Sequence, residues 1–174
     1  KRLRPITCTM PKPLVPLLNK PTLFYTLELL KKHGMDEVTI TLGYMAEDIK
    51  RAVGDGSAFG LKVAYSNPKS RLGTAGSVKF ALRSEEGEEP VLVMSGDGFT
   101  DIDLAAAVKA HKESGAAATL ILCRVENPCE YGIAITDEKG YIKGFTEKPS
   151  PGEAYSDFAN TGIYLCQIDQ AASG

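Results

Sequence analysis

The chain has 174 residues and a mass of 18.7 kDa, with 43% hydrophobic and 24% charged residues, which are the proportions of a soluble globular protein. The net charge of −2 argues against a generally basic nucleic-acid-binding protein. The sequence predicts no membrane segment, because no apolar run approaches the roughly 18 residues of a span, and it predicts no signal peptide. Four scattered cysteines form no C-x-x-C pair, which argues against a zinc site and a disulfide framework and favours a reducing cytoplasm.

The first 27 residues form a basic, proline-rich segment. They carry five basic residues and no acidic one, so this segment has a charge of +5 and the rest of the chain has −7. Five of the ten prolines also lie there. Proline fixes φ and disfavours helical backbone in its predecessor, so we expect an ordered, extended, non-helical loop over residues 4–20. A stiff cationic loop suits a polyphosphate, because it loses little entropy on binding; a solvated basic arm, or one that touches nucleic acid, is the alternative.

Apolar spacing predicts alternating helices and strands up to residue 124. In chain order we expect a helix from Pro21 to Gly34, a strand over 38–42, a helix over 45–53, a strand over 61–65, a helix over 74–83, a buried central strand over 91–94, a helix over 103–114 and a buried strand over 117–124. This alternation predicts an α/β fold with a mostly parallel, doubly wound sheet. Beyond it, the turn Asp137-Glu138-Lys139-Gly140 predicts an antiparallel hairpin excursion, and residues 158–166 resemble a further strand.

Asp97 is the most informative polar residue. It follows the apolar run 91–94 and lies between Gly96 and Gly98. Ligands of α/β sheets bind beyond the carboxyl ends of the strands, and glycines let a ligand approach the backbone closely. A carboxylate at this point can hold Mg²⁺, which takes one or two protein carboxylates together with waters and substrate phosphates. A helix-capping or turn aspartate is the alternative, because Asp101 and Asp103 follow and can cap the next helix, and we expect Asp101 to be a cap.

A glycine-rich segment, Leu72-Gly73-Thr74-Ala75-Gly76-Ser77, opens a predicted helix. Its backbone N–H groups could bind an anion or lie against a nucleobase. The segment lacks the G-x-x-x-x-G-K-[ST] pattern of a Walker A loop. An ordinary tight helix start is therefore the alternative.

Two further motifs lie at the predicted hairpin and the last strand. Tyr131-Gly132 and Glu147-Lys148-Pro149 flank the hairpin, where Glu147 and Lys148 could bind a polyol and its phosphate. A surface charge pair before a proline turn is the alternative. Asn160-Thr161-Gly162 interrupts an apolar strand with small and polar groups, which indicates either close approach of a ligand to the backbone or a β-bulge.

The histidines and two of the cysteines are expected to be structural. His33 and His111 lie in or at the ends of predicted helices, with no Ser or Cys arranged as a catalytic partner. Cys123 and Cys166 fall in apolar strands and are expected to be small core residues.

Taken in chain order, these motifs resemble those of the sugar-1-phosphate nucleotidylyltransferases, also called nucleoside-diphosphate-sugar pyrophosphorylases. The resemblance covers almost the whole chain. It rests on Arg2-Leu3-Arg4-Pro5-Ile6-Thr7, Pro11-Lys12-Pro13-Leu14-x-Pro16, Lys20-Pro21, Leu72-Gly73-Thr74-Ala75-Gly76, Ser95-Gly96-Asp97, Tyr131-Gly132, Glu147-Lys148-Pro149 and Asn160-Thr161-Gly162-Ile163-Tyr164. The L-G-T-A-G form of the glycine-rich segment looks most similar to the mannose-1-phosphate guanylyltransferases.

The resemblance implies a Rossmann-like α/β fold and an enzyme that joins a nucleoside triphosphate and a sugar 1-phosphate into an NDP-sugar, with release of pyrophosphate. The implied substrates are GTP and mannose 1-phosphate. Arg2 and Lys12 would bind the triphosphate and the departing pyrophosphate, and Asp97 would bind Mg²⁺. The implied nucleotide contacts are Gly73, Thr74, Ala75 and Gly76, and the implied sugar-phosphate contacts are Gly132, Glu147, Lys148, Asn160 and Thr161.

Two family features are absent from the sequence. One is a G-G-x-G loop, with its strand, before Arg2; the other is a second metal-binding aspartate, for which Asp169 lies too close to the last strand. Both fall at the ends of the chain, so we expect residues 1–174 to be a catalytic domain truncated at both ends. No nucleic acid or membrane partner is expected, and a homo-oligomer is left open.

Other functions remain as alternatives. Within the same family these are a glucose-1-phosphate thymidylyl- or uridylyltransferase, and a non-catalytic regulatory subunit that binds nucleotide sugars. An RNA-binding module is disfavoured, because the remainder of the chain carries −7 and the basic segment has few interleaved aromatic residues.

Overall fold

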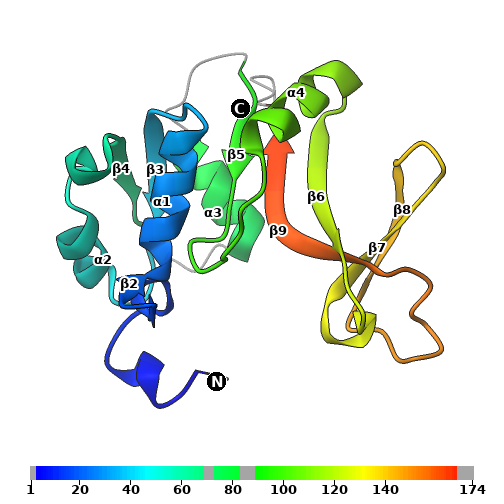
Figure 1. The fold of residues 1–174 in the computed structure, drawn as a ribbon, viewed down its shortest axis with the longest axis horizontal. Coiled ribbons are helices and arrows are strands. Elements are labelled where there is room, and N and C mark those ends of the chain that lie inside the picture. Colours follow the sequence, from blue (N-terminus) through cyan, green and yellow to red (C-terminus); the bar gives the residue numbers. More distant parts are fainter. Residues whose placement is uncertain (1–2, 69–72, 83–88, 168–174) are drawn as a thin grey trace. The chain divides into compact units, whose positions relative to one another are not determined.

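The structure is a computed structural model that describes residues 3–68, 73–82 and 89–167 (Figure 1). The chain divides into two compact units. The first unit comprises Lys1–Glu89, Ser95–Lys109 and Ile168–Gly174, and the second comprises Pro90–Met94 and Ala110–Gln167. The expectation of one truncated catalytic domain over residues 1–174 stays a prediction.

The first unit combines two parallel strands with α-helices and short turns. Its described elements are η1 (Ile6–Cys8), η2 (Lys12–Leu14), β1 (Pro16–Leu17), β2 (Lys20–Pro21), α1 (Thr22–Lys32), β3 (Glu37–Thr41), α2 (Ala46–Val53), η3 (Ser57–Phe59), β4 (Lys62–Ser66) and α3 (Gly73–Ala81). α4 (Leu104–Ser114) begins in this unit and ends in the second. The helices and strands that the apolar spacing predicts are therefore present, with ends shifted by one or two residues where they differ.

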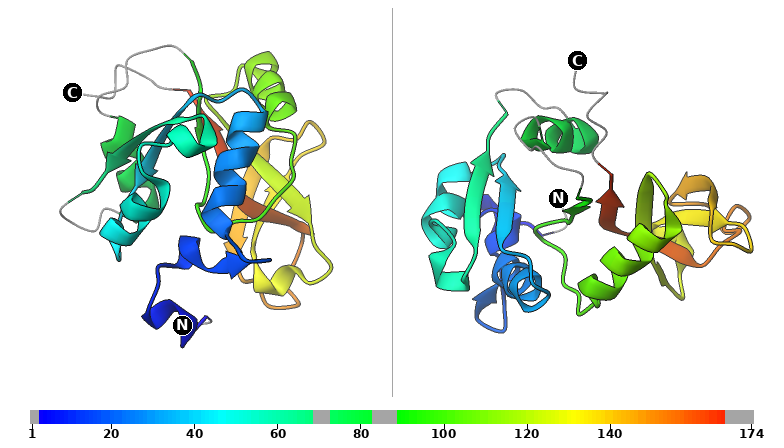
Figure 2. Two further views of the ribbon diagram at one scale, coloured as in Figure 1. Left: turned by 60° about the vertical axis from the view of Figure 1, so that its left-hand side comes forward. Right: turned by 90° about the horizontal axis from the view of Figure 1, so that it is seen from above.

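The core of the first unit lies among α1, α2, β3 and β4. Val38 and Ile40 of β3 face Val63 and Tyr65 of β4 in a parallel register. The buried cluster consists of Leu23, Leu27, Leu42, Ile49, Val53 and Leu61. Burial of a side chain of this size contributes about 1.5–3 kcal/mol, so this cluster fixes α1 and α2 next to the strand pair. Figure 2 shows this arrangement from two further directions.

The basic, proline-rich segment forms short turns. η1 and η2 are single 3₁₀ turns, and β1 pairs with β2 in an antiparallel hairpin. Leu18 and Asn19 connect these strands with φ values of 49° and 64°, as a two-residue type I′ turn requires. The prediction of an extended, non-helical loop over residues 4–20 is wrong for η1 and η2, which are 3₁₀ helices, whereas β1 and β2 are extended. A 3₁₀ turn accepts proline at its first positions, where the missing N–H costs nothing.

The cap of α4 is Asp103. Its Oδ1 accepts a hydrogen bond of 2.9 Å from the backbone N–H of Ala106, the third residue of the helix. The prediction that Asp101 caps this helix is therefore wrong. Asp103, which lies two residues after Asp101, directly precedes the helix, so its carboxylate reaches the backbone N–H groups of the first turn that have no partner within the helix.

The second unit is a sheet built around β9. Its described elements are β5 (Val91–Val93), β6 (Ala118–Arg124), η5 (Pro128–Glu130), β7 (Gly132–Thr136), β8 (Ile142–Glu147) and β9 (Phe158–Cys166). β9 pairs antiparallel with β5, β6 and β7, and β7 pairs antiparallel with β8. β9 is the long curved strand in Figure 1. Leu165 on β9 is fully buried, and Ile133 on β7 is as well.

The central strand of this sheet differs from the expected one. All three residues of β5 are half-buried, and β6 has exposed residues at both ends. The predictions of a buried central strand over 91–94 and a buried strand over 117–124 are therefore wrong. The reason is the pairing: the second half of β9 lies between β5 and β6, so β9 has neighbours on both edges.

The α/β class is confirmed, and so are the predicted hairpin and the predicted strand over 158–166. Among the described pairs, β3 and β4 form the parallel part. The antiparallel part is larger than a hairpin excursion, because β9 runs antiparallel to three other strands. The longest described helices, α1 and α4, have 11 residues each, and no helix in the described ranges could cross a membrane.

Candidate functional site

In the first unit, Lys12 and Asp97 form an ion pair. Lys12 is the first residue of η2, between Pro11 and Pro13. The turn is held in place, because Leu14 donates its backbone N–H to Pro11 and Thr22 donates its hydroxyl to the Pro13 carbonyl at 3.0 Å. The ammonium thus projects from a braced turn, with its side chain 58% exposed.

Asp97 lies in the turn that follows β5. Ser95 donates its hydroxyl to Asp97 Oδ1 at 2.5 Å, while Lys12 contacts Oδ2. The backbone N–H of Gly98 closes the turn on the Ser95 carbonyl at 3.3 Å. Partial burial acts to raise the pKa of Asp97, but the hydrogen bonds from Lys12 and Ser95 and the charge of Lys12 outweigh it and hold this pKa below its usual value. Asp97 is therefore ionised at neutral pH.

The residues around Asp97 fit a magnesium site that is completed by ligand phosphates. Each carboxylate oxygen has one protein partner and keeps acceptor capacity for a further one. Within the described ranges, no group of three or more His, Cys, Asp or Glu side chains could hold a metal. Mg²⁺ commonly takes one or two protein carboxylates and fills its shell with waters and phosphate oxygens, so one ionised carboxylate is a sufficient protein contribution.

The predicted nucleotide contacts lie at the start of α3. The helix begins at Gly73, whose φ is +68°, and no described atom lies within 4 Å of where a Cβ of Gly73 would stand. Thr74, Ala75 and Gly76 follow in the first turns of the helix. Their role stays a prediction. Arg2, and Leu72 of the same motif, lie outside the described residues, as does Asp169.

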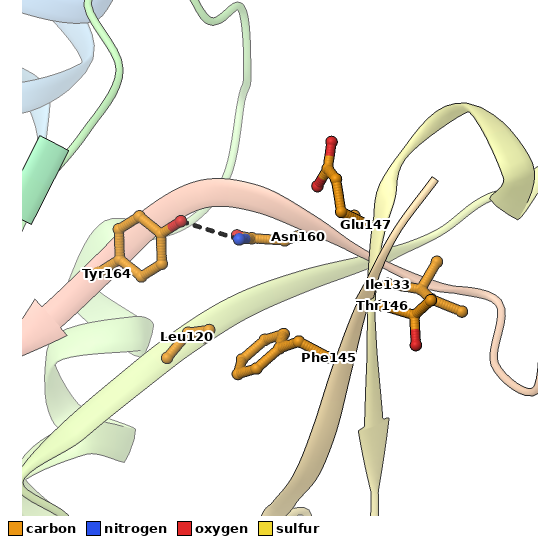
Figure 3. A pocket seen from close by; sticks show the side chains of 8 residues that line it. Leu120, Ile133, Phe145, Thr146, Glu147, Asn160 and Tyr164 are labelled. Carbon is orange, nitrogen blue, oxygen red and sulfur yellow. Dashed lines mark hydrogen bonds between the residues drawn. The ribbon is translucent and has the colours of Figure 1, made fainter. Parts of the chain in front are cut away.

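In the second unit, three of the predicted sugar-phosphate residues line one cavity. The cavity has a volume of about 440 Å³ (Figure 3). Its lining residues are Leu120, Gly132, Ile133, Phe145, Thr146, Glu147, Asn160 and Tyr164. Gly132, Glu147 and Asn160 come from three different strands, β7, β8 and β9. The sheet therefore brings together residues that are far apart in the sequence.

Gly132 and Glu147 are direct neighbours across the β7–β8 pair. A Cβ added to Gly132 would lie 2.6 Å from Glu147 Oε2, which is closer than real Cβ contacts. The absence of a side chain at position 132 therefore leaves the space that the Glu147 carboxylate occupies. The next residue, Lys148, has a φ of +46° and donates its backbone N–H to the Tyr131 carbonyl at 2.9 Å. Lys148 does not line the cavity.

Asn160 is held at both ends of its amide. Its Nδ2 donates to the Tyr164 hydroxyl at 2.8 Å, and its Oδ1 accepts from the backbone N–H of Gly162 at 2.9 Å. Figure 3 shows the Asn160 side chain pointing to the Tyr164 hydroxyl. A second N–H and a second lone pair remain on the amide.

Thr161 is part of a β-bulge. Its hydroxyl donates to the Ile121 carbonyl at 2.7 Å and accepts from the backbone N–H of Ile163 at 3.3 Å. The register between β6 and β9 shifts at this point, and Gly162 has a φ of +76°. The sequence left a bulge and a ligand site as alternatives for this motif; the bulge is present, and Asn160 next to it lines the cavity.

The histidines fit structural roles. His111 is buried, and its Nδ1 lies 2.8 Å from the Thr119 hydroxyl oxygen. His33 is half-buried, and its Nδ1 lies 3.4 Å from Asp103 Oδ1.

All four cysteines are free. The prediction that Cys123 lies in the core is wrong, because its side chain is exposed near the end of β6. Cys166 is half-buried, and burial raises the pKa of its thiol.

Sequence reasoning missed Ser95 and Tyr164 as parts of these sites. Ser95 lies two residues before Asp97, a spacing at which serine hydroxyls commonly bond local groups in turns. Tyr164 lies four residues after Asn160, and the period of two along a strand places such residues on one face. Both residues stood in the quoted motifs without a role.

The comparisons with known proteins identify the family. A family model described as nucleotidyl transferase matches residues 1–169. This chain belongs to the nucleotidyl transferase family. The predicted resemblance to sugar-1-phosphate nucleotidylyltransferases is confirmed by curated relatives that carry such names.

Three of these relatives have different substrates in their names. The UTP–glucose-1-phosphate uridylyltransferase of Synechocystis is 40% identical over 188 aligned positions, which cover 99% of this chain and 48% of that protein. The glucose-1-phosphate thymidylyltransferase of Streptomyces griseus is 41% identical, with 94% and 45% covered. The mannose-1-phosphate guanylyltransferase catalytic subunit beta of Drosophila melanogaster is 36% identical, with 94% and 44% covered. The chain spans about half the length of these relatives.

Two solved structures are similar to this chain, and the first of them confirms the Rossmann-like fold. A Bacillus anthracis protein assigned as a glucose-1-phosphate thymidylyltransferase, solved in complex with sucrose, matches with a TM-score of 0.84 and 26% identity, covering 99% of this chain and 73% of that one. HddC from Yersinia pseudotuberculosis, solved with GMP-PN, has a TM-score of 0.79 at 24% identity, with 91% and 68% covered. The second match supports the fold alone.

Proposed function

We propose that this nucleotidyl transferase family chain serves a reaction that joins a nucleoside triphosphate and a hexose 1-phosphate. In this reaction a phosphate oxygen of the sugar 1-phosphate attacks the α-phosphorus of the triphosphate in line. The bond between the α-phosphorus and the bridging oxygen of the β-phosphate breaks, and pyrophosphate leaves with the electron pair of that bond. The products are an NDP-sugar and pyrophosphate.

The observation that carries this proposal is the cavity of the second unit. It combines a carboxylate from Glu147, an anchored amide from Asn160 and the exposed ring of Phe145. A carboxylate and an amide supply the acceptors and donors that sugar hydroxyls need, and an aromatic ring offers an apolar face for the C–H side of a sugar ring. Polar groups at fixed positions in a mainly apolar cavity are typical of a small-molecule site.

The phosphate chemistry is assigned to the first unit. Lys12 would stabilise charge that develops on the departing pyrophosphate, and Arg2 is proposed to assist it. Asp97 would hold Mg²⁺, which when bound polarises phosphate oxygens as a Lewis acid. The carboxylate is ionised and braced by Ser95, so it needs little reorganisation to act as a ligand. Gly73, Thr74, Ala75 and Gly76 are proposed nucleotide contacts.

The remaining residues of the proposed sugar-phosphate site, Lys148, Gly132 and Thr161, are proposed to have different roles. Lys148 follows Glu147 directly and would bind the phosphate of the sugar 1-phosphate as a point charge. Gly132 would keep the space for Glu147, because a Cβ at position 132 would lie only 2.6 Å from Glu147 Oε2. Thr161 uses its hydroxyl proton inside the sheet, so its contribution to the ligand would come through its place next to Asn160.

The base and the sugar are to be chosen by experiment. Relatives named for uridylyl, thymidylyl and guanylyl transfer match at 36–41% identity. The glycine-rich segment Leu72-Gly73-Thr74-Ala75-Gly76 favours GTP with mannose 1-phosphate, and that pair is the first to test.

The test is a pyrophosphate-release panel on the purified protein. It crosses UTP, dTTP, GTP and ATP with glucose 1-phosphate, mannose 1-phosphate and N-acetylglucosamine 1-phosphate, with and without Mg²⁺. We expect release with at least one pair, dependent on Mg²⁺. Nucleotide-sugar binding without pyrophosphate release from any pair would contradict the enzyme and support a regulatory subunit.

A further inference from the structure

Four residues in one stretch of β9 form a local hydrogen-bonded arrangement around a β-bulge: Asn160, Thr161, Gly162 and Tyr164. Along a straight strand, residues four apart are separated by about 13 Å, which is a long reach for an asparagine side chain. Here Asn160 Nδ2 lies 2.8 Å from the Tyr164 hydroxyl. The bulge explains the contact: three residues of β9, Thr161 to Ile163, lie opposite the single residue Ile121 of β6.

Each member of this bulge has a defined contribution. Gly162 adopts a φ of +76°, which other residues rarely tolerate. Thr161 fixes the bulge to β6, because its hydroxyl donates to the Ile121 carbonyl at 2.7 Å. The bulge therefore redirects the strand between Asn160 and Tyr164, as bulges near binding sites commonly do.

The two ends of the Asn160 amide are then distinguished. Gly162 donates its backbone N–H to Oδ1, so a rotation of the amide by 180° would set Nδ2 against that N–H. Tyr164 takes one Nδ2 proton and holds the other end of the amide. Asn160 and Tyr164 are both half-buried and line the cavity. Among the described residues, Asn160 is the one hydrogen-bond partner of the Tyr164 hydroxyl.

We infer that Tyr164 is a positioning residue for sugar-phosphate binding: its hydroxyl, together with the Gly162 N–H that sets the orientation of the amide, holds the Asn160 side chain in place, so that one N–H and one lone pair are presented to adjacent hydroxyl groups of the sugar. This inference rests on the proposed function of the cavity. It assigns to Tyr164 a part in ligand recognition, whereas a packing role would require only its ring.

The test compares Tyr164→Phe with wild type in steady-state kinetics, using the substrate pair that the pyrophosphate panel selects. Phenylalanine keeps the ring and removes the hydroxyl. We expect the KM for the sugar 1-phosphate to rise about three- to ten-fold, the equivalent of one hydrogen bond, with the KM for the nucleotide unchanged. Tyr141→Phe is the matched control, because Tyr141 belongs to the same unit, is 58% exposed and does not line the cavity; its constants should equal those of wild type.

A double-mutant comparison tests whether Tyr164 acts through Asn160. Asn160→Ala should raise the sugar-phosphate KM at least as much as Tyr164→Phe. The double variant should then be no worse than Asn160→Ala alone, because the amide that Tyr164 holds is already absent. Full additivity, or an unchanged KM in Tyr164→Phe, would overturn the inference.

A nuclear magnetic resonance titration separates this inference from the proposed function. The side-chain amide signals of Asn160 are followed while mannose 1-phosphate or glucose 1-phosphate is added in the presence of Mg²⁺. Should the wild type show no turnover, the proposed reaction fails, and the titration still decides the positioning role. We expect saturable shifts in wild type and weaker affinity in Tyr164→Phe. Equal affinities, or no binding of either sugar phosphate to wild type, would overturn the inference.

Discussion

Lys12 and Asp97 neutralise each other in the ligand-free chain, although one comes from the proline-rich segment and the other from the turn after β5. The two residues are the ones proposed for opposite tasks, since Lys12 would meet an anion and Asp97 a cation. Their contact satisfies both charges in the absence of ligand. In the proposed function, a metal–nucleotide complex would supply each of them with its own partner.

Replacing Asp97 by asparagine should nearly abolish turnover. The amide keeps the size of the side chain but lacks the negative charge that a hard cation needs. Asp36→Asn is the matched control, because Asp36 also pairs with a lysine, Lys31, at 2.6 Å on the surface of the same unit. Initial rates at saturating Mg²⁺ check this. Retention of more than about a tenth of the wild-type rate, a loss below about 1.4 kcal/mol, would show that Asp97 is not the metal ligand.

Lys12→Ala should lower kcat and weaken nucleotide binding together. One charge-assisted hydrogen bond contributes about 1.5–3 kcal/mol, so the combined effect is roughly ten- to a hundred-fold. The same change should strengthen Mg²⁺ binding to the ligand-free protein, because a competing cation leaves Asp97. Calorimetry with MgCl₂ and kinetics with the nucleotide give the two readouts. If Lys12 is a surface lysine in a linker, Lys12→Ala leaves both the affinity for Mg²⁺ and the kinetics with the nucleotide unchanged.

The contribution of the Lys12–Asp97 pair to stability should depend on pH. The pKa of Asp97 in the folded chain is lowered from 3.8, so the carboxylate stabilises the fold above that value. This contribution is lost as the pH falls through the lowered pKa. The Tm difference between wild type and Lys12→Ala, measured from neutral pH downward, should be largest at neutral pH and become smaller as the pH falls through the lowered pKa. A difference that grows on acidification has the wrong sign and would refute the pairing.

Gly132→Ala should damage sugar-phosphate binding through Glu147. The new Cβ would stand 2.6 Å from Glu147 Oε2, so the carboxylate has to move. A misplacement of about 1 Å in a binding group can reduce catalytic efficiency up to about a hundred-fold, and we expect a rise in the sugar-phosphate KM with little change in nucleotide KM. Gly144→Ala is the matched control, because among the described atoms its Cβ would meet Ile135 Cδ1 alone, at 4.0 Å. Equal constants for the two variants would remove Glu147 from the site.

Much of the secondary structure could be predicted from apolar periodicity. The bounds of β9 agree with the prediction residue for residue, and the hairpin turn at Asp137–Gly140 joins β7 to β8 as expected. Local patterns could not predict the pairing of strands. The apolar run at Val91–Val93 resembles a central strand, but β9 takes that place, because it pairs with β5, β6 and β7. Such pairing depends on contacts between distant residues, which periodicity does not encode.

The residues of the candidate site likewise divide into those that could be predicted from the sequence and those that depend on contacts in the folded chain. Asp97 was predicted from its position between two glycines after an apolar run, and Glu147 and Asn160 from the resemblance of their motifs to those of the family. The side chains that hold two of them could be identified only in the structure. Ser95 donates to Asp97, and Tyr164 accepts from Asn160. The resemblance implied Thr161 as a sugar-phosphate contact, whereas its hydroxyl bonds to the Ile121 carbonyl within the sheet. A motif residue can therefore support a site by shaping the backbone.

The most direct measurement follows the α-phosphate. The protein is incubated with Mg²⁺, a sugar 1-phosphate and a nucleoside triphosphate labelled at the α-phosphorus, and the products are separated. Attack at the α-phosphorus predicts label in an NDP-sugar, with unlabelled pyrophosphate released in equal amount and with both products lost in Asp97→Asn. Label that stays in the triphosphate for every base and sugar, or NDP-sugar formation by Asp97→Asn at the wild-type rate, would contradict the proposed function.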